Sequence, residues 1–172
     1  MPQETKRTIP SDLIEATAFE LMRRAAIEIP EDFRLGVEAM VDTEAEDLSR
    51  FVLESMVENW HAAEEDRRAM CADTGLPRYY VKAGNEAVIG GGFVALERAL
   101  RRATARATHE IPLRPNRVHP LSRADHNNNV GINAPEIEFS FEPDADWLDI
   151  TTVHKGGLFG TDYRMLFPGD GK

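Results

Sequence analysis

The spacing of apolar residues changes along the chain, and this change limits the folds that are open to it. Up to about residue 60, and again over residues 93–108, large apolar residues recur at helical spacing. Residues 78–82, 136–142 and 147–154 instead have the residue types and alternation of half-buried strands. Helices followed by strands, with no regular βαβ alternation, favour an α+β fold. We therefore predict an N-terminal helical layer packed on a small sheet that is mixed or antiparallel.

A capping residue and a proline delimit the first two predicted helices. Ser11 suits the start of a helix that runs to about Ile29, where Pro30 stops it. Glu31 suits the first turn of a second, shorter helix that ends near Val41.

A third helix is predicted to begin at a capping box. Thr43 would be the cap, and Glu46 stands at the third position, from which its side chain can return a hydrogen bond. The helix carries large apolar residues on one face, which we expect in the core: Leu48, Phe51, Val52, Met56 and Trp60.

The second half of the chain combines one more helix with the expected strands. Residues 93–108 form an amphipathic helix whose polar face carries four arginines, and this row is a solvated face, a subunit contact or a ligand site. Residues 110–135 are polar and irregular, and loops of this length inside a compact domain are often functional. The turn at 143–146 joins the last two strands, which we expect to pair as an antiparallel hairpin.

Length and composition indicate one soluble domain over residues 1–172, with a loose arm at residues 1–10. No apolar stretch approaches the roughly 18 residues that a membrane span needs. The N-terminus also lacks the apolar segment of a signal peptide. The single cysteine, Cys71, excludes an intrachain disulfide, so we expect a cytoplasmic protein.

Charge is distributed unevenly along the chain. Residues 1–66 hold 17 acidic and 6 basic residues, residues 67–123 hold 4 and 11, and residues 124–172 hold 9 and 3. The net charge of −10 argues against general binding to nucleic acid. The cationic section contains Cys71, so a small anionic ligand would meet a favourable field there. The alternative is a basic surface that meets an acidic one, within the chain or on a partner.

The residues around Cys71 are the strongest candidates for chemistry. Asp73 follows two residues later, and a carboxylate in such a place can act as a general acid or base. The alternative is a plain turn, in which Asp73 bonds to the backbone and Gly75 takes a positive φ. One thiolate cannot hold an iron–sulfur cluster or a structural zinc ion, since both usually need three or four protein ligands. Cys71 therefore works alone or has partners on another chain.

Four blocks stand in order along the chain: Cys71-Ala72-Asp73-Thr74-Gly75, Leu113-Arg114-Pro115-Asn116 with Pro120-Leu121-Ser122-Arg123, Asn129-Val130-Gly131-Ile132-Asn133-Ala134-Pro135 and Lys155-Gly156-Gly157. They resemble Cys-Gln-Asp-Thr-Gly, Leu-Arg-Pro-Asn with Pro-Leu-Thr-Arg, Asn-Thr-Gly-x-Asn-x-Pro and the start of Lys-Gly-Gly-Gly-Ser-Glu-Asn in the class I fumarase family. This is the iron–sulfur hydro-lyase family of fumarate hydratases and L-tartrate dehydratase alpha subunits. The resemblance spans roughly residues 11–171.

The resemblance implies a site and a reaction. In the family, three cysteines hold a [4Fe-4S] cluster whose open iron binds a small hydroxy-dicarboxylate, a base removes a proton, and hydroxide leaves. Carried over by position, Cys71 would be a metal ligand, Asp73 the catalytic carboxylate, and Arg114 the grip on a substrate carboxylate. The other substrate-binding positions implied are Asn129, Lys155, Gly156 and Gly157.

The sequence also departs from the family's pattern. Ala72 replaces the Gln of the first block, and Val130 replaces the Thr of the third. The family's second and third cluster cysteines lie further along than Lys172. The resemblance therefore implies an oligomer in which a partner subunit supplies those cysteines and the C-terminal domain.

Three hypotheses about function follow from these blocks. The first is a catalytic component of a hydro-lyase that acts on a dicarboxylate of the fumarate/malate or tartrate type. The second is a non-catalytic binding or assembly subunit that kept the fold and lost the cluster. The third, and the weakest, is a cluster-free enzyme that uses Cys71 or Asp73 directly.

Overall fold

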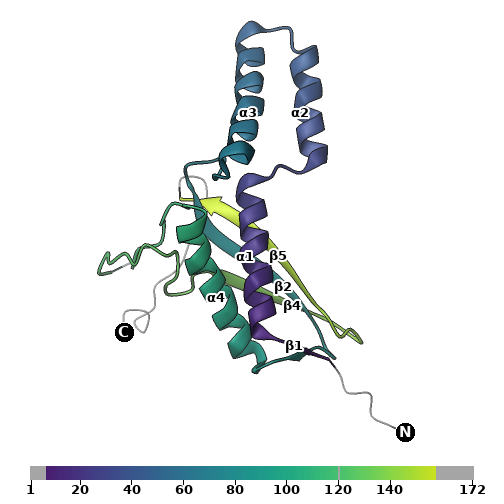
Figure 1. The fold of residues 1–172 in the computed structure, drawn as a ribbon, viewed down its shortest axis with the longest axis vertical. Coiled ribbons are helices and arrows are strands. Elements are labelled where there is room, and N and C mark those ends of the chain that lie inside the picture. Colours follow the sequence, from purple (N-terminus) through teal and green to yellow (C-terminus); the bar gives the residue numbers. More distant parts are fainter. Residues whose placement is uncertain (1–6, 120, 158–172) are drawn as a thin grey trace.

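Helices lie against a small sheet in the computed structural model, which describes residues 7–119 and 121–157 (Figure 1). The predicted α+β fold is therefore confirmed. Within these residues the elements follow in the order β1 (Thr8–Ile9), α1 (Ser11–Ile27), α2 (Glu31–Thr43), α3 (Asp47–Asp66), β2 (Thr74–Gly84), β3 (Val88–Ile89), α4 (Gly92–Glu110), β4 (Glu136–Glu142) and β5 (Leu148–Gly156).

The main sheet has three strands in the order β4–β2–β5, with β2 in the middle. β4 pairs with β2 in parallel, and β5 pairs with it in antiparallel. The predicted hairpin of the last two strands is therefore wrong in its pairing, because β2 lies between them. Parallel pairing of β2 with β4 needs a long crossover, which α4 and the loop after it provide.

The core lies between the sheet and helices α1 and α4, which run side by side across it (Figure 1). Alternate residues of β2, namely Tyr79, Val81 and Ala83, are buried beneath the helices. The Tyr79 hydroxyl lies 3.1 Å from the Thr104 hydroxyl of α4 and 2.8 Å from the Met22 sulfur of α1. Burial raises the pKa of Tyr79 well above its usual range, so this hydroxyl stays protonated and joins all three elements.

Helices α2 and α3 form a hairpin that extends away from the sheet beyond the end of α1 (Figure 1). Phe33 of α2 and Trp60 of α3 pack with their ring centroids 6.0 Å apart, and Val37 is buried beside this contact. Trp60 is buried as predicted. The same prediction is wrong for the other large apolar residues of α3, since all four are exposed: Leu48, Phe51, Val52 and Met56. A helix in a two-helix hairpin has only one side covered by its neighbour.

Two element boundaries also differ from the sequence prediction. Thr43 does not cap α3: it is the last residue of α2, and its hydroxyl donates a hydrogen bond of 3.0 Å to the Ala39 carbonyl. Helix α3 begins four residues later, at Asp47. Within the segment predicted to be a loose arm, Thr8–Ile9 form β1 and pair in parallel with β3.

Residues 1–6, 120 and 158–172 lie outside the described part of the chain. Among the residues that the structure does describe, no helix has both the length and the apolar character that crossing a membrane requires.

Candidate functional site

A short turn carries Cys71 into the central strand. The Thr74 N–H donates a hydrogen bond of 3.1 Å to the Cys71 carbonyl, and Thr74 then begins β2. The Arg114 N–H in turn donates to the Thr74 carbonyl at 2.9 Å, which ties the loop after α4 to the start of β2. A Cβ on Gly75 would overlap the Arg114 carbonyl. Gly75 is therefore required by this close approach and not, as predicted, by a positive φ.

Asp73 and Arg114 form an ion pair across this junction. The Asp73 side chain is 14% exposed and the Arg114 side chain 59% exposed, so the carboxylate is shielded and the guanidinium faces outward. A Cβ on Gly156 would overlap the Asp73 carboxylate, so glycine at this position leaves the space that Asp73 occupies. An arginine held from behind by a carboxylate can present its other N–H donors to an anion.

Asn129 lies under the same junction as a buried bridge. Its Oδ1 accepts a hydrogen bond of 2.8 Å from the Asn116 N–H, and its Nδ2 donates to the Arg114 carbonyl at 3.0 Å and to the Thr108 hydroxyl at 3.2 Å. The side chain of Asn129 is fully enclosed, at 1% exposure. This placement makes Asn129 a buried bridge of the junction, and its contact with a substrate stays a prediction.

Asn116 was not among the predicted site residues, yet it lies at the centre of the junction. Its side-chain amide donates a hydrogen bond of 2.9 Å to the Asp73 carbonyl. A Cβ on Gly157 would stand 3.5 Å from the Asn116 Oδ1. The sequence signals for this role were the position of Asn116 in the irregular polar segment 110–135 and at the end of the Leu113-Arg114-Pro115-Asn116 block.

The structure thus brings most of the predicted site residues together at one end of the sheet. Asp73, Arg114 and Gly156 are in direct contact, and Gly157 lies beside Asn116. Lys155 is a half-buried residue of β5, and its backbone lies opposite Leu76 of β2.

A cavity of about 470 Å³ opens beside the junction. The residues that line it are Arg68, Ala69, Cys71, Ala72, Thr74, Pro112 and Arg114. Cys71 is exposed there, close to two arginines. Cavities of this size hold small ligands, and the arginines favour an anionic one.

The donor set around Cys71 does not by itself fit an iron–sulfur cluster. A [4Fe-4S] cluster is held by cysteine thiolates, and this sequence has one cysteine. Within residues 7–119 and 121–157, no three His, Cys, Asp or Glu side chains gather as a metal site would require. The chain therefore supplies at most one thiolate ligand to such a cluster.

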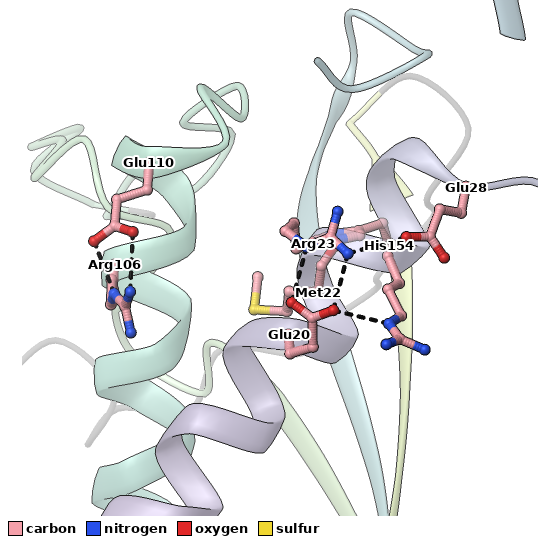
Figure 2. Close-up of polar contacts among 8 residues, drawn as sticks. Glu20, Met22, Arg23, Glu28, Arg106, Glu110 and His154 are labelled. Atoms are coloured by element: carbon pink, nitrogen blue, oxygen red, sulfur yellow. Dashed lines mark hydrogen bonds and ion pairs between the residues drawn. The ribbon is translucent and has the colours of Figure 1, made fainter. Parts of the chain in front are cut away.

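Three of the four arginines of α4 make ion pairs within the chain. Arg101 and Arg106 pair with Glu97 and Glu110 of the same helix, and Arg102 pairs with Glu15 of α1. Figure 2 shows the Arg106–Glu110 pair facing α1. For these three arginines, the sequence alternative of a basic surface that meets acidic groups within the chain is the one observed.

A second polar network lies on α1 (Figure 2). Glu20 accepts hydrogen bonds of 2.8 Å from both Arg23 and Arg24, and these two guanidinium groups lower the pKa of Glu20 to about 2. The His154 Nε2 of β5 lies 2.9 Å from the Met22 carbonyl, and burial lowers the pKa of His154. The His154 contact joins α1 to the sheet, while the Glu20 pairs lie within α1. None of these residues lines the cavity beside Cys71.

Comparison with known proteins was made at the level of sequence. The family model described as "Fumarate hydratase (Fumerase)" matches residues 15–171. A Methanocaldococcus jannaschii protein named for the alpha subunit of L(+)-tartrate dehydratase is 34% identical over 163 residues, which is 92% of this chain and 56% of that protein.

Two further relatives carry related names. The L(+)-tartrate dehydratase subunit alpha of Escherichia coli strain K12 is 26% identical over 99% of this chain and 56% of its own length. A Geobacillus stearothermophilus protein named for class I fumarate hydratase is 27% identical over 81% of this chain and 26% of its own length. The chain thus spans little more than half of the tartrate dehydratase relatives and about a quarter of the fumarate hydratase relative.

Proposed function

The chain belongs to the fumarate hydratase (Fumerase) family of class I hydro-lyases, and on that premise we propose that it is one component of an enzyme that adds water to, or removes it from, a small hydroxy-dicarboxylate. The observation that carries the proposal is the Asp73–Arg114 ion pair beside the cavity that Cys71 also lines. A shielded carboxylate behind an outward-facing guanidinium suits recognition of a substrate carboxylate.

In this proposal each residue has a task that its placement allows. Arg114 binds one carboxylate of the substrate through N–H donors directed away from Asp73. Asp73 orients Arg114, and its carboxylate is the candidate acid–base group of this chain. Gly156 and Gly157 keep the space around Asp73 and Asn116 clear of side chains.

A partner subunit is part of the proposal. Since these 172 residues offer one thiol, a [4Fe-4S] cluster at Cys71 would need further thiolates from beyond this sequence, and we propose a partner subunit as their source. Two relatives are named as alpha subunits, which agrees with an enzyme built from more than one kind of chain.

Replacing Arg114 in the purified native complex tests the proposal. Hydration of fumarate and dehydration of L-malate and L-tartrate are measured for the native complex and for Arg114→Lys, which keeps the charge but loses the planar fork. We expect kcat/KM for the accepted substrate to fall about 100-fold, as removal of about 3 kcal/mol of charge-assisted hydrogen bonding would produce. Arg98→Lys, at an exposed position of α4 outside the four blocks, is the matched control and leaves activity unchanged.

The second candidate function is a non-catalytic assembly subunit. It is favoured by the single cysteine and by Ala72, which stands where the family has Gln. This candidate predicts that Arg114→Lys and Cys71→Ser leave the activity of the complex unchanged. A colourless native complex that keeps activity, and loses it on Asp73→Asn, would favour the cluster-free alternative instead.

A further inference from the structure

One face of α3 is exposed from Leu48 to Ala62 and carries no charge between them. Leu48, Val52, Ser55, Asn59 and Ala62 follow one another at spacings of four, three, four and three residues, and all five are exposed. We refer to these five residues as the α3 seam. Leu48 is 71% exposed, and Phe51 beside the seam is 65% exposed. Val52 and Met56 bring the exposed large apolar residues of this helix to four. An exposed apolar patch of this kind is unusual unless another molecule covers it.

The geometry of the seam suits a second helix. Alternating spacings of four and three residues keep side chains on one stripe of a helix, which is the pattern of a coiled-coil contact. Ser55 and Ala62 are small, so a neighbouring helix can approach closely there. From Leu48 to Ala62 the seam extends about 21 Å at 1.5 Å per residue, or four turns.

Within the described part of the chain, the contact of α3 with α2 lies on another side of the helix. Trp60 marks that side through its packing on Phe33, and Trp60 lies about 120° around the helix from Leu48. Helix α2 therefore leaves the seam uncovered.

Charge indicates which kind of helix the seam takes. Residues 31–66 carry twelve carboxylates and two arginines, a net charge of −10. Both arginines are engaged locally: Arg34 pairs with Glu38, and Arg50 donates a hydrogen bond to the Glu44 carbonyl. A second copy of this hairpin would bring like charges together. Arg101, Arg102 and Arg106 of α4 are already paired with the chain's own carboxylates, so these cations are not available to the seam of a second copy.

The seam leads to the candidate site. The Asn59 amide donates a hydrogen bond of 3.0 Å to the Met70 carbonyl, and Cys71 is the next residue along the chain. Cys71 is exposed and lines the 470 Å³ cavity together with Arg68. A helix laid along the seam therefore passes Asn59 toward Met70 and the exposed thiol of Cys71.

We propose that the α3 seam is the docking surface for a helix of a different polypeptide, whose apolar residues are flanked by Lys or Arg and which approaches Cys71. The docking itself stands on the exposure and charge of α3, while its link with catalysis rests on the proposed function. The partner's helix covers the apolar residues of the seam, and its cations offset the carboxylates on the rim.

Site-specific photo-crosslinking in the cells from which the chain comes tests the occupant. The probe is p-benzoylphenylalanine, placed at Ser55 or at Ala62 on the seam, and at Leu35 on α2 as a control that is 53% exposed and lies away from the seam. After irradiation, mass spectrometry identifies the crosslinked peptide. We expect Ser55 and Ala62 to give the same product, a Lys- or Arg-flanked apolar segment of one other polypeptide, and Leu35 to give none. The proposal is overturned if the product forms with a second copy of this chain or with residues of the same chain. It is also overturned if the yield at Ser55 and Ala62 is no higher than at Leu35.

Charge substitutions separate this proposal from the proposed function. Val52→Glu should lower the fraction of chain found in the native complex at least tenfold by native mass spectrometry, whereas Leu35→Glu, at a site of similar exposure, should not. Far-ultraviolet circular dichroism checks that both variants keep their helix content. If Val52→Glu assembles normally into an active complex, the docking proposal fails and the proposed function stands. If assembly depends on Val52 but the native complex has no hydro-lyase activity, docking stands and the proposed function fails.

Discussion

Asn129 connects one side-chain group and two backbone groups that come from two other segments. Its amide links Thr108 at the end of α4, the Arg114 carbonyl and the Asn116 N–H. Its φ of 56° lies in the left-handed region, which asparagine tolerates better than most residues. The sequence singled out this position through its block, but it could not reveal that the amide faces inward, because its partners come from two other segments.

Asn129→Ala should lower the free energy of unfolding by about 3 kcal/mol from the lost hydrogen bonds, at about 1 kcal/mol each. Asn127→Ala is the matched control, since Asn127 also has a positive φ of 54° and is exposed. The control shares only the left-handed backbone cost of about 1 kcal/mol. Urea unfolding followed by circular dichroism measures both. Equal losses in the two variants would contradict the bridging role of Asn129.

Two glycines offer opposite outcomes for the same substitution. A Cβ on Gly156 would overlap the Asp73 carboxylate, whereas a Cβ on Gly36 of α2 would meet nothing within 4 Å. We expect Gly156→Ala to destabilise the fold by about 2 kcal/mol through overpacking. Gly36→Ala should stabilise it by about 1 kcal/mol, since alanine favours a helix. Thermal unfolding compares them, and a stabilised Gly156→Ala variant would show that Asp73 does not occupy this space.

At the scale of elements, the sequence predicted type and order better than pairing. Helix α1 begins at Ser11, but Pro10 and not Ser11 holds its cap position. The predicted strands appear as β2, β4 and β5. The turn after β4 was also foreseen, and β4 and β5 do run in opposite directions. Strand β2 nevertheless lies between them in the sheet. The central position suits β2, because its inward-facing residues are buried under α1 and α4. Alternation within a strand identifies its inward face but carries no information on which strand is its neighbour.

The contact of β5 with α1 should make stability depend on pH. Burial lowers the pKa of His154, although the Met22 carbonyl opposes this shift by accepting a hydrogen bond from the ring. The folded chain therefore holds His154 neutral, while the unfolded chain takes up a proton below a pH of about 6.5. Stability contributed by this group is complete above that pH and is lost as the pH falls, by at most about 1.4 kcal/mol per pH unit.

Urea unfolding at about pH 7.5 and about pH 5.5 measures this dependence. We expect His154→Gln to reduce the loss of stability between the two conditions, because glutamine does not titrate. His126→Gln, at an exposed position, controls for the change of residue type. If the native chain and His154→Gln lose the same stability, the titrating group lies elsewhere.

At the scale of the whole molecule, the apolar residues fall into two classes that their spacing does not separate. Most of those of α1, α4 and β2 are buried in the core, with Leu13, Phe93 and Val94 as exceptions. In contrast, Leu48, Phe51 and Val52 of α3 are exposed. Both classes recur at regular spacing, so periodicity alone predicted a core position for each. Burial depends on what lies opposite a face, and the acidic hairpin has no such layer within the described residues. This is why the fold class was predictable and the exposed seam was not.

Assembly should change the reactivity of the single thiol, because Cys71 is exposed beside the cavity where the seam ends. In the isolated chain, a disulfide reagent such as dithionitrobenzoate should modify Cys71 without denaturant. In the native complex we expect modification at least tenfold slower, since the partner would cover the thiol or bind it to a metal. The Val52→Glu chain, which should not dock, provides the control and is expected to react fast even with the partner present. If the thiol reacts equally fast in the assembled complex, the partner neither covers Cys71 nor binds it to a metal. The proposed link between docking at the seam and the cavity beside Cys71 would then be wrong.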